Sequence, residues 1–345
     1  MNFASDNTAG ISAPILSAIE AANTGFSPSY ATDALTREVE SRMAEIFEHP
    51  VSVFVVTTGT AANALSLAAL APPWTAVLAS HDAHVMTDEC GAVEMFSGGA
   101  RVTGIDGAYA KIDAEALRAR LDDWPRGRPH ALQPGALTIS QASEFGAVWT
   151  PPEIEAIGAI AKAHGIGLHM DGARFANAVA ALDCAPADIS WRAGVDILSF
   201  GATKNGAMGA EAIVVFTPAV AETLEKRRMR SGHLVSKSRF VAAQWLAYLR
   251  DGHWLELAAH ANAMAARLAA AIDASPGARL AAPTEANEVF AWLTDDIIGA
   301  LRAAGAVFHE WPRHGGAGGE SMVRLVASFA TSTSETDRFG EILKA

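Results

Sequence analysis

The chain has 345 residues and half of them are hydrophobic, which is enough apolar material for a large domain with a smaller one beside it and argues against a disordered chain. Its 26 basic and 38 acidic residues give a net charge of -12, which argues against nucleic acid or an anionic membrane as a main partner. Cys90 and Cys184 are too few for a disulfide framework and fit a reducing compartment.

The first residues do not resemble a signal peptide, because Asp6 comes early and no basic region leads into an apolar block. Residues 51–80 contain no charge, but Gly59, Asn63 and the pair Pro72-Pro73 interrupt the apolar run. This pattern is typical of a buried strand, turn and helix rather than a membrane span. We therefore expect a cytoplasmic protein without a membrane-spanning segment.

The first third of the chain predicts helices at 14–22 and 36–48 after a polar leader, FASDN. The β-branched run VSVFVV then predicts a strand, and TTGTAANALSLAAL predicts the turn and helix that follow it. Thr58, Gly59 and Thr60 stand at this strand-to-helix junction, where free N–H groups can bind a phosphate. The alternative is a tight turn with an ordinary helix cap.

The middle of the chain alternates apolar runs with helical patterns between residues 50 and 216, which indicates crossover units and a mostly parallel sheet flanked by helices. Strands are expected at 76–80, 136–140, 165–170 and 194–200. His81, His84, Asp88 and Glu89 lack a standard zinc spacing, so no metal site is expected. The absence of a GxGxxG motif after the first strand argues against a nicotinamide cofactor.

The last third predicts a smaller α+β domain, with strand-like pieces at VFAWL, AVFHEW and SMVRLVASF. We therefore divide the chain into an N-terminal segment, 1–20, a large α/β domain, 21–245, and a small domain, 246–345.

Four polar residues follow predicted strands of the large domain, and they are Thr58, Gln141, Asp171 and Lys204. Since ligands collect at the carboxyl ends of parallel strands, these residues are expected to meet in one crevice. A carboxylate after one strand and a lysine after another suit pyridoxal phosphate, which needs a charge partner for its ring nitrogen and a covalent lysine. Taken singly, Asp171 could cap a turn and Lys204 could lie on the surface.

The motifs FASDNTAG, TGTAAN, AHVMTDECGA, MDGARFANA, FGATKNGAMGAEA and SKSRF occur in this order along nearly the whole chain. Together they resemble the low-specificity L-threonine aldolases, including the phenylserine-aldolase-like branch. These are pyridoxal phosphate enzymes of the aspartate-aminotransferase fold, and the resemblance implies that fold and that cofactor here.

The resemblance also implies roles for residues that match the family motifs. Lys204 would bind the cofactor covalently, Asp171 would hold its ring nitrogen, and Arg174 would lie near its phenolic oxygen and the substrate carboxylate. His84 would stack on the ring, and His130 would lie near the β-hydroxyl of the substrate. Each histidine and Arg174 could instead be structural.

Residues from both ends of the chain complete the implied site. Ser5 and Arg324 would bind the substrate carboxylate, with Tyr30 and Lys237 reaching the site of a neighbouring subunit. The chain has SGHLVSKSRF where the better-known branch has GGGMRQ, so either Lys237 or Arg239 could bind phosphate. A homo-oligomer, a dimer or a tetramer built from two dimers, is implied.

The implied reaction is the retro-aldol cleavage of β-hydroxy-α-amino acids to glycine and an aldehyde. A related β-eliminating lyase and a non-catalytic pyridoxal-phosphate-binding protein remain as alternatives, because the same apparatus supports several reactions. Loss of Lys204 or Asp171 would mark the non-catalytic protein, and both are present.

Overall fold

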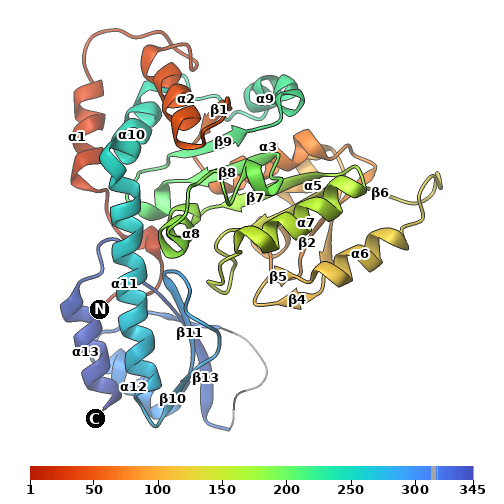
Figure 1. Cartoon of the computed structure of the whole chain (residues 1–345). Coiled ribbons are helices and arrows are strands. Elements are labelled where there is room, and N and C mark those ends of the chain that lie inside the picture. The colour runs from red at the N-terminus through yellow and green to blue at the C-terminus, as the bar shows by residue number, and fades with distance from the viewer. Residues whose placement is uncertain (312–315, 317, 345) are drawn as a thin grey trace.

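The computed structural model describes residues 1–311, 316 and 318–344. Residues 312–315, 317 and 345, which fall within the predicted small domain, lie outside the described residues. The described chain forms two sheets, each with its own helices (Figure 1).

The larger sheet has seven strands in the order β1-β9-β8-β7-β6-β2-β3. Its strands are β1 (Ser52–Val56), β2 (Thr75–Ser80), β3 (Arg101–Ile105), β6 (Gln133–Ser140), β7 (Gly167–Gly172), β8 (Ile197–Gly201) and β9 (Glu211–Val215). The strands from β3 to β8 are parallel, whereas β9 runs antiparallel to both β8 and β1. The prediction of a mostly parallel α/β sheet is therefore confirmed.

Helices cover both faces of this sheet because alternate strand residues point to opposite sides. Val56 and Ile213 pack with residues of α3 and α9 in one apolar cluster. Their neighbours Val55 and Val214 pack on the other side with residues of α7, α8 and α10. The helices of this part are α1 (Ala13–Ala22), α2 (Ala34–Ile46), α3 (Gly59–Leu70), α4 (His84–Thr87), α5 (Ala92–Ser97), α6 (Ala114–Asp122), α7 (Pro151–Ala163), α8 (Phe175–Leu182), α9 (Pro218–Arg230) and α10 (Arg239–Leu249).

The smaller sheet is antiparallel, in the order β10-β11-β13-β12, and packs against long helices. Its elements are α11 (His253–Asp273), β10 (Ala278–Leu280), β11 (Glu288–Thr294), α12 (Asp295–Ala303), β12 (His309–Glu310), β13 (Glu320–Val326) and α13 (Thr333–Leu343). A short hairpin of β4 (Gly107–Ala108) and β5 (Lys111–Ile112) forms a separate two-stranded sheet.

The N-terminal residues pack with the smaller sheet. Phe3 is fully buried in its core, donates its N–H to the carbonyl of Val307 and accepts a hydrogen bond from the N–H of Val326. The single 3₁₀ turn η1 (Asp6–Thr8) follows directly. This arrangement carries Ser5, Asp6 and Asn7 to the boundary between the two sheets, where the pocket lies.

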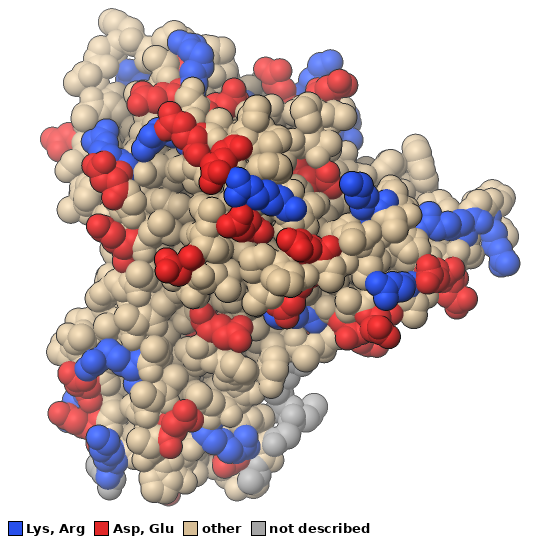
Figure 2. Space-filling model, viewed as in Figure 1, with Lys and Arg blue, Asp and Glu red and all other residues tan. Residues whose placement is uncertain are grey.

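Among the described residues, no helix is long and apolar enough to cross a membrane. On the face drawn in Figure 2, basic side chains lie among acidic ones and form no continuous basic patch. This distribution agrees with the net charge of -12.

Candidate active site

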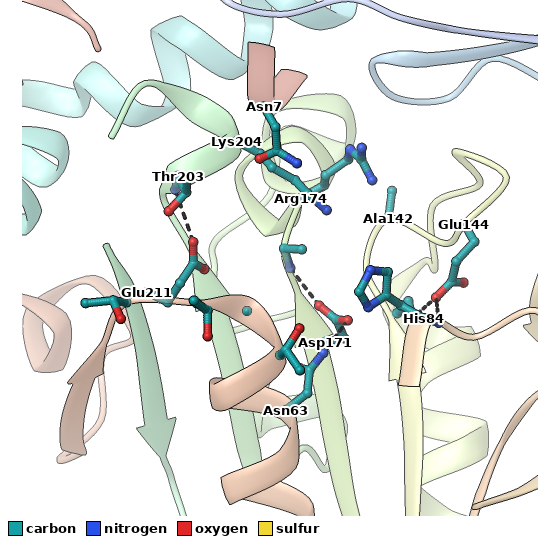
Figure 3. A pocket seen from close by; sticks show the side chains of 16 residues that line it. Asn7, Asn63, His84, Ala142, Glu144, Asp171, Arg174, Thr203, Lys204 and Glu211 are labelled. Carbon is teal, nitrogen blue, oxygen red and sulfur yellow. Dashed lines mark hydrogen bonds between the residues drawn. The ribbon is translucent and has the colours of Figure 1, made fainter. Parts of the chain in front are cut away.

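A cavity of about 360 Å³ opens at the carboxyl ends of the central parallel strands. Asp171 comes from the end of β7, Ser140 from the end of β6, and Lys204 from the short 3₁₀ turn η3 (Thr203–Asn205) that follows β8 (Figure 3). The junction of β1 and α3 supplies Thr58, Gly59 and Thr60. The structure thus brings together residues that lie 146 positions apart, from Thr58 to Lys204.

The Asp171 carboxylate forms the floor of this cavity and has both oxygens engaged. Asn63 Nδ2 donates to Oδ2 at 2.8 Å, and the N–H of Ala173 donates to Oδ1 at 3.0 Å. Burial by itself would raise the pKa of this carboxyl, but the charges of His84 and Lys204 and the Ala173 hydrogen bond hold the pKa below its usual value. Asp171 therefore remains an anion that can accept a hydrogen bond from a protonated ring nitrogen.

The N-terminus of α3 forms another wall of the cavity. Thr58 caps the helix, because its side chain accepts a hydrogen bond from the N–H of Ala61 at 3.2 Å. The junction is thus an ordinary capped helix start as well as a cavity wall, and its first-turn N–H groups and dipole favour an anion. Glu211 of β9 lies in the same cavity, and burial raises its pKa to about 7, so its carboxyl can be neutral there.

His84 and Glu144 line the opposite side. Glu144 Oε1 accepts hydrogen bonds from the His84 N–H at 2.8 Å and from Ser140 Oγ at 2.6 Å. Burial raises the pKa of Glu144 to about 7 despite these two donors. Its carboxyl can therefore gain or lose a proton near neutrality, which suits an acid or base.

A second cavity, of about 540 Å³, shares its boundary with the first. Asn7, His84, Glu144, Arg174 and Lys204 line both cavities. The second one extends to Ser5, Glu288, Trp311 and Arg324 on the side of the smaller sheet.

Buried charges meet in this second cavity. Arg174 binds Asp6 through two hydrogen bonds, of 2.8 and 3.1 Å, and its NH1 lies 3.1 Å from Oε2 of Glu288. Arg324 lies farther from Glu288, at 3.9 Å, and its guanidinium stacks over Trp311. Among the described residues, Nε of Arg324 is buried without a hydrogen-bond partner. This unused donor suits an incoming carboxylate.

The predicted site residue Gln141 does not line either cavity. Gln141 is fully buried, and its side chain bonds both the carbonyl and the N–H of Trp149, at 2.8 and 3.0 Å. These two hydrogen bonds hold together the two ends of the loop 141–149, which carries Glu144. Its neighbours Ser140 and Ala142 line the cavity instead.

His130 lines neither cavity of this chain, and its role near the substrate stays a prediction. His130 is exposed in the loop before β6, at the amino end of that strand. The eight residues of β6 separate this end from the pocket, a distance of roughly 25 Å. His130 precedes Gln141 by eleven positions, so the two residues lie at opposite ends of β6.

Tyr30, Lys237 and Arg239 also lie outside the two cavities. The loop that carries Tyr30 is bound to the segment around Lys237, because the Tyr30 N–H donates to the Ser236 carbonyl at 3.0 Å. Tyr30 and Lys237 are both exposed. Arg239 donates to the carbonyls of Thr24 and Gly25, at 3.2 and 3.4 Å.

Sequence reasoning missed several cavity residues, namely Asn63, Glu144 and Glu288. Glu144 follows a predicted strand end by four residues, which could have drawn attention to it. Asn63 is polar within an apolar helical run, and such a residue usually has a buried partner. Glu288 carries no such local signal.

The residues present fit pyridoxal phosphate. Asp171 offers an ionised acceptor with its geometry already set, the N-terminus of α3 offers free N–H groups to a phosphate, and Lys204 lies in the wall between the two cavities. Among the described residues, no group of three or more His, Cys, Asp or Glu side chains could hold a metal ion.

Comparisons with known proteins agree with this geometry. Residues 2–296 match the family model described as Beta-eliminating lyase. A low specificity L-threonine aldolase of Pseudomonas aeruginosa is 43% identical over 315 residues, covering 91% of this chain and 90% of that protein. A second one, from Pseudomonas sp. (strain NCIMB 10558), is 42% identical with the same coverage.

A solved structure is similar over the whole fold. The threonine aldolase of Leishmania major is 30% identical, with a TM-score of 0.93 over 99% of this chain and 98% of that one. A putative aromatic amino acid beta-eliminating lyase/threonine aldolase from Exiguobacterium sp. 255-15 shares the fold, with a TM-score of 0.74 at 18% identity over 96% of this chain and 93% of that one. The chain therefore belongs to the beta-eliminating lyase family and, within it, to the low-specificity L-threonine aldolases, which are pyridoxal phosphate enzymes of fold type I.

Proposed function

We propose that this enzyme cleaves L-threonine, L-allo-threonine and related β-hydroxy-α-amino acids to glycine and an aldehyde. One observation carries the proposal: the cavity that contains Asp171 adjoins a second cavity that ends at Arg324, and Lys204 lies in the wall of both. A cofactor bound over Asp171 would thus face a substrate whose carboxylate reaches Arg324.

When bound, pyridoxal phosphate supplies an electron-accepting ring beside the substrate α-carbon. Asp171 would keep the ring nitrogen protonated, and Lys204 would provide the covalent attachment of the cofactor. Thr58, Gly59 and Thr60, at the first turn of α3, would hold the phosphate. His84, which lines the same cavity, would stack on the ring.

Arg324, Ser5 and Arg174 orient the substrate in this proposal. The planar guanidinium of Arg324 matches a carboxylate with two parallel hydrogen bonds. A carboxylate held there turns the bond between the α- and β-carbons into the reactive orientation, a positioning effect of several kcal/mol. The charge of Arg174 is already compensated by Asp6 and Glu288, so it acts as a second, weaker contact.

Two groups at the boundary of the cavities can accept the proton of the β-hydroxyl. The hydrogen bond that His84 Nδ1 donates to Glu89 raises the pKa of His84, which favours its protonated form and reduces its capacity as a base. Glu144, with a pKa of about 7, is more often ionised at slightly alkaline pH. A water held by either group can serve as the relay.

Tyr30 and Lys237 are proposed to reach the site of a second subunit, in a homodimer or a tetramer of two dimers in the cytoplasm. Their exposure, and the hydrogen bond that joins their two loops, support this arrangement. Light scattering measures the oligomeric state. The affinities of Lys237→Ala and Arg239→Ala for pyridoxal phosphate are then compared with that of wild type. The variant with the weaker affinity identifies the residue that binds the cofactor phosphate.

The direct test mixes the holoenzyme with L-threonine, L-allo-threonine and phenylserine and measures glycine and aldehyde. Lys204→Ala is assayed alongside and is expected to lose the borohydride-reducible chromophore and at least about a thousandfold in turnover. A wild-type protein without such a chromophore, or a variant with full turnover, would contradict the assignment.

A related β-eliminating lyase is the second candidate, because the matching family model carries that description. Such an enzyme would release pyruvate and ammonia from L-serine. Finding these products in place of glycine and aldehyde would favour it. A non-catalytic protein is disfavoured because Lys204 and Asp171 are both present in the cavity.

A further inference from the structure

A chain of buried hydrogen bonds joins His84 to Asp171 beneath the cavity. His84 Nδ1 lies 2.8 Å from Oε1 of Glu89, and Asn63 Nδ2 donates to that same oxygen at 2.8 Å. The second hydrogen of Asn63 Nδ2 reaches Asp171 Oδ2, also at 2.8 Å. Asn63 and Glu89 are only 2% and 4% exposed, so water does not compete for these bonds.

The donors and acceptors define where the hydrogens lie. An ionised carboxylate only accepts hydrogen bonds, so the hydrogen between Glu89 and His84 belongs to Nδ1 of the histidine. Nε2 is then the ring nitrogen that gains or loses a proton. The amide of Asn63 separates the two carboxylates and uses both of its N–H bonds to do so.

The charges of these groups are coupled. The hydrogen bond that His84 donates to Glu89 raises the pKa of His84, whereas burial, followed by the charge of Asp171, raises the pKa of Glu89 itself. The charged or titratable side chains around the His84 ring and backbone are Glu89, Glu144, Asp171 and Lys204. A change of charge at Glu89 therefore alters the pKa of both His84 and Asp171.

We propose that Glu89 and Asn63 are positioning residues of this enzyme: Glu89 holds His84 with its hydrogen on Nδ1, and Asn63 couples that pair to Asp171 and so to the cofactor ring nitrogen. Neither residue lies where it must touch the substrate, since Glu89 lines neither cavity and Asn63 lies in the helix wall. The inference rests on the role proposed for Asp171.

The first test is Glu89→Gln, which keeps the shape and the accepting oxygen but removes the charge. In cofactor-free protein, the titration midpoint of His84 is expected to fall by about one pH unit or more, because an opposite charge at hydrogen-bond distance is lost. Histidine NMR signals report the midpoint, and His84→Asn assigns the signal. Activity plays no part in this measurement.

The second test is Asn63→Ser, which removes the bridge between the two carboxylates. The pH midpoint of the absorbance of the bound cofactor is expected to shift, and the cofactor dissociation constant to rise about tenfold, because Asp171 loses a charge-assisted donor. Asn177→Ser is the matched control. Asn177 is also buried and donates to Asn262 at 3.0 Å, but it lines neither cavity.

The proposal is wrong if Glu89→Gln leaves the His84 midpoint within about 0.3 pH unit of wild type. It is also wrong if Asn63→Ser and Asn177→Ser change the cofactor absorbance and affinity alike. If Glu89→Gln does not fold, the proposal is tested by the cofactor absorbance and affinity of Asn63→Ser alone. A protein that shows both shifts but releases no glycine from any β-hydroxy amino acid would overturn the proposed reaction and leave this coupling intact.

Discussion

The floor of the pocket and its junction with the smaller sheet both contain buried carboxylates, yet they are bonded very differently. Each oxygen of Asp171 at the floor accepts a hydrogen bond, at 2.8 and 3.0 Å. At the junction, neither oxygen of Glu288 has a hydrogen bond from another described residue, although Arg174 lies 3.1 Å away. Burial raises the pKa of Glu288, while that of Asp171 is lowered.

The difference follows from how each region is assembled. The floor is built within one sheet and the helix packed on it, so short bonds are set by the fold itself. The junction joins segments from four places in the chain, at Asp6, Arg174, Glu288 and Arg324. Its charges are balanced but loosely bonded, which leaves Arg324 able to take a substrate carboxylate. We infer a preformed cofactor floor and an adjustable substrate end.

The largest effect is expected at the floor, from Asp171→Asn. This change keeps the size of the side chain but removes the negative charge that stabilises a protonated ring nitrogen. Turnover is expected to fall by roughly three to four orders of magnitude, with smaller loss of cofactor affinity. Steady-state kinetics and cofactor titration measure the two. Near-normal turnover would show that the floor does not require its charge.

The next effect is on stability, from Asp6→Ala at the junction. It leaves Arg174 without its closest partner, and breaking a buried ion pair costs about 3 to 5 kcal/mol of unfolding free energy. Denaturant unfolding of cofactor-free protein measures this loss, with Asp6→Asn as the conservative comparison. An equal loss in both variants is expected if the charge of Asp6 matters, whereas a loss confined to Asp6→Ala would point to packing rather than charge.

The same pair gives a pH dependence. Burial opposes ionisation of Asp6, but Arg174 and Lys204 hold its pKa below the usual value, so its stabilising contribution is present above the unfolded-state pKa of about 4. That contribution is lost as the pH falls through the lower folded-state pKa. The difference between wild type and Asp6→Ala should therefore narrow in strong acid. A difference that grows in acid would contradict this sign.

Arg324→Lys tests the adjustable substrate end. A lysine keeps the charge but loses the two-pronged geometry, so KM is expected to rise about 10- to 100-fold while kcat changes less. Arg338→Lys, an exposed arginine of α13, is the control and should leave both constants unchanged. A fall in kcat at constant KM would place the role of Arg324 after substrate binding.

A smaller effect is expected from Glu211→Gln in the cavity wall. Burial raises the pKa of Glu211 in the folded state to about 7, above its pKa in the unfolded state. The folded state is therefore destabilised as the pH rises from the unfolded-state pKa through 7. Cofactor-free Glu211→Gln should therefore be more stable than wild type by about 1 to 2 kcal/mol at pH 8 and no more stable at pH 5. Denaturant unfolding curves of both proteins at pH 8 and pH 5 measure this difference in stability. Equal differences at the two pH values would contradict the prediction.

The smallest effect is expected from His130→Ala, outside both regions. Its exposed position before β6 predicts kinetic constants within about twofold of wild type. His84→Ala, measured in parallel, is expected to reduce turnover much more. A large loss in His130→Ala would mean that this loop reaches a pocket of another subunit.

Local patterns in the sequence were sufficient for the sheet, its crevice and the residues directly after its strands. Alternating strands and helices predicted the parallel sheet, and Thr58, Asp171 and Lys204 all lie in the cavity because strand ends share one edge of a sheet. The same logic did not apply to Gln141, whose side chain turns inward to Trp149.

Tertiary structure alone decided which polar side chains meet across long distances in the chain. Asn63, Glu89 and Asp171 form one hydrogen-bonded chain although 108 positions separate the first from the last. Asp6 and Glu288 approach Arg174 only because the N-terminal segment and β11 meet the large domain at the boundary between the two sheets. Such partners have no periodic signal, since a hydrogen bond depends on distance and direction in space and not on spacing along the chain.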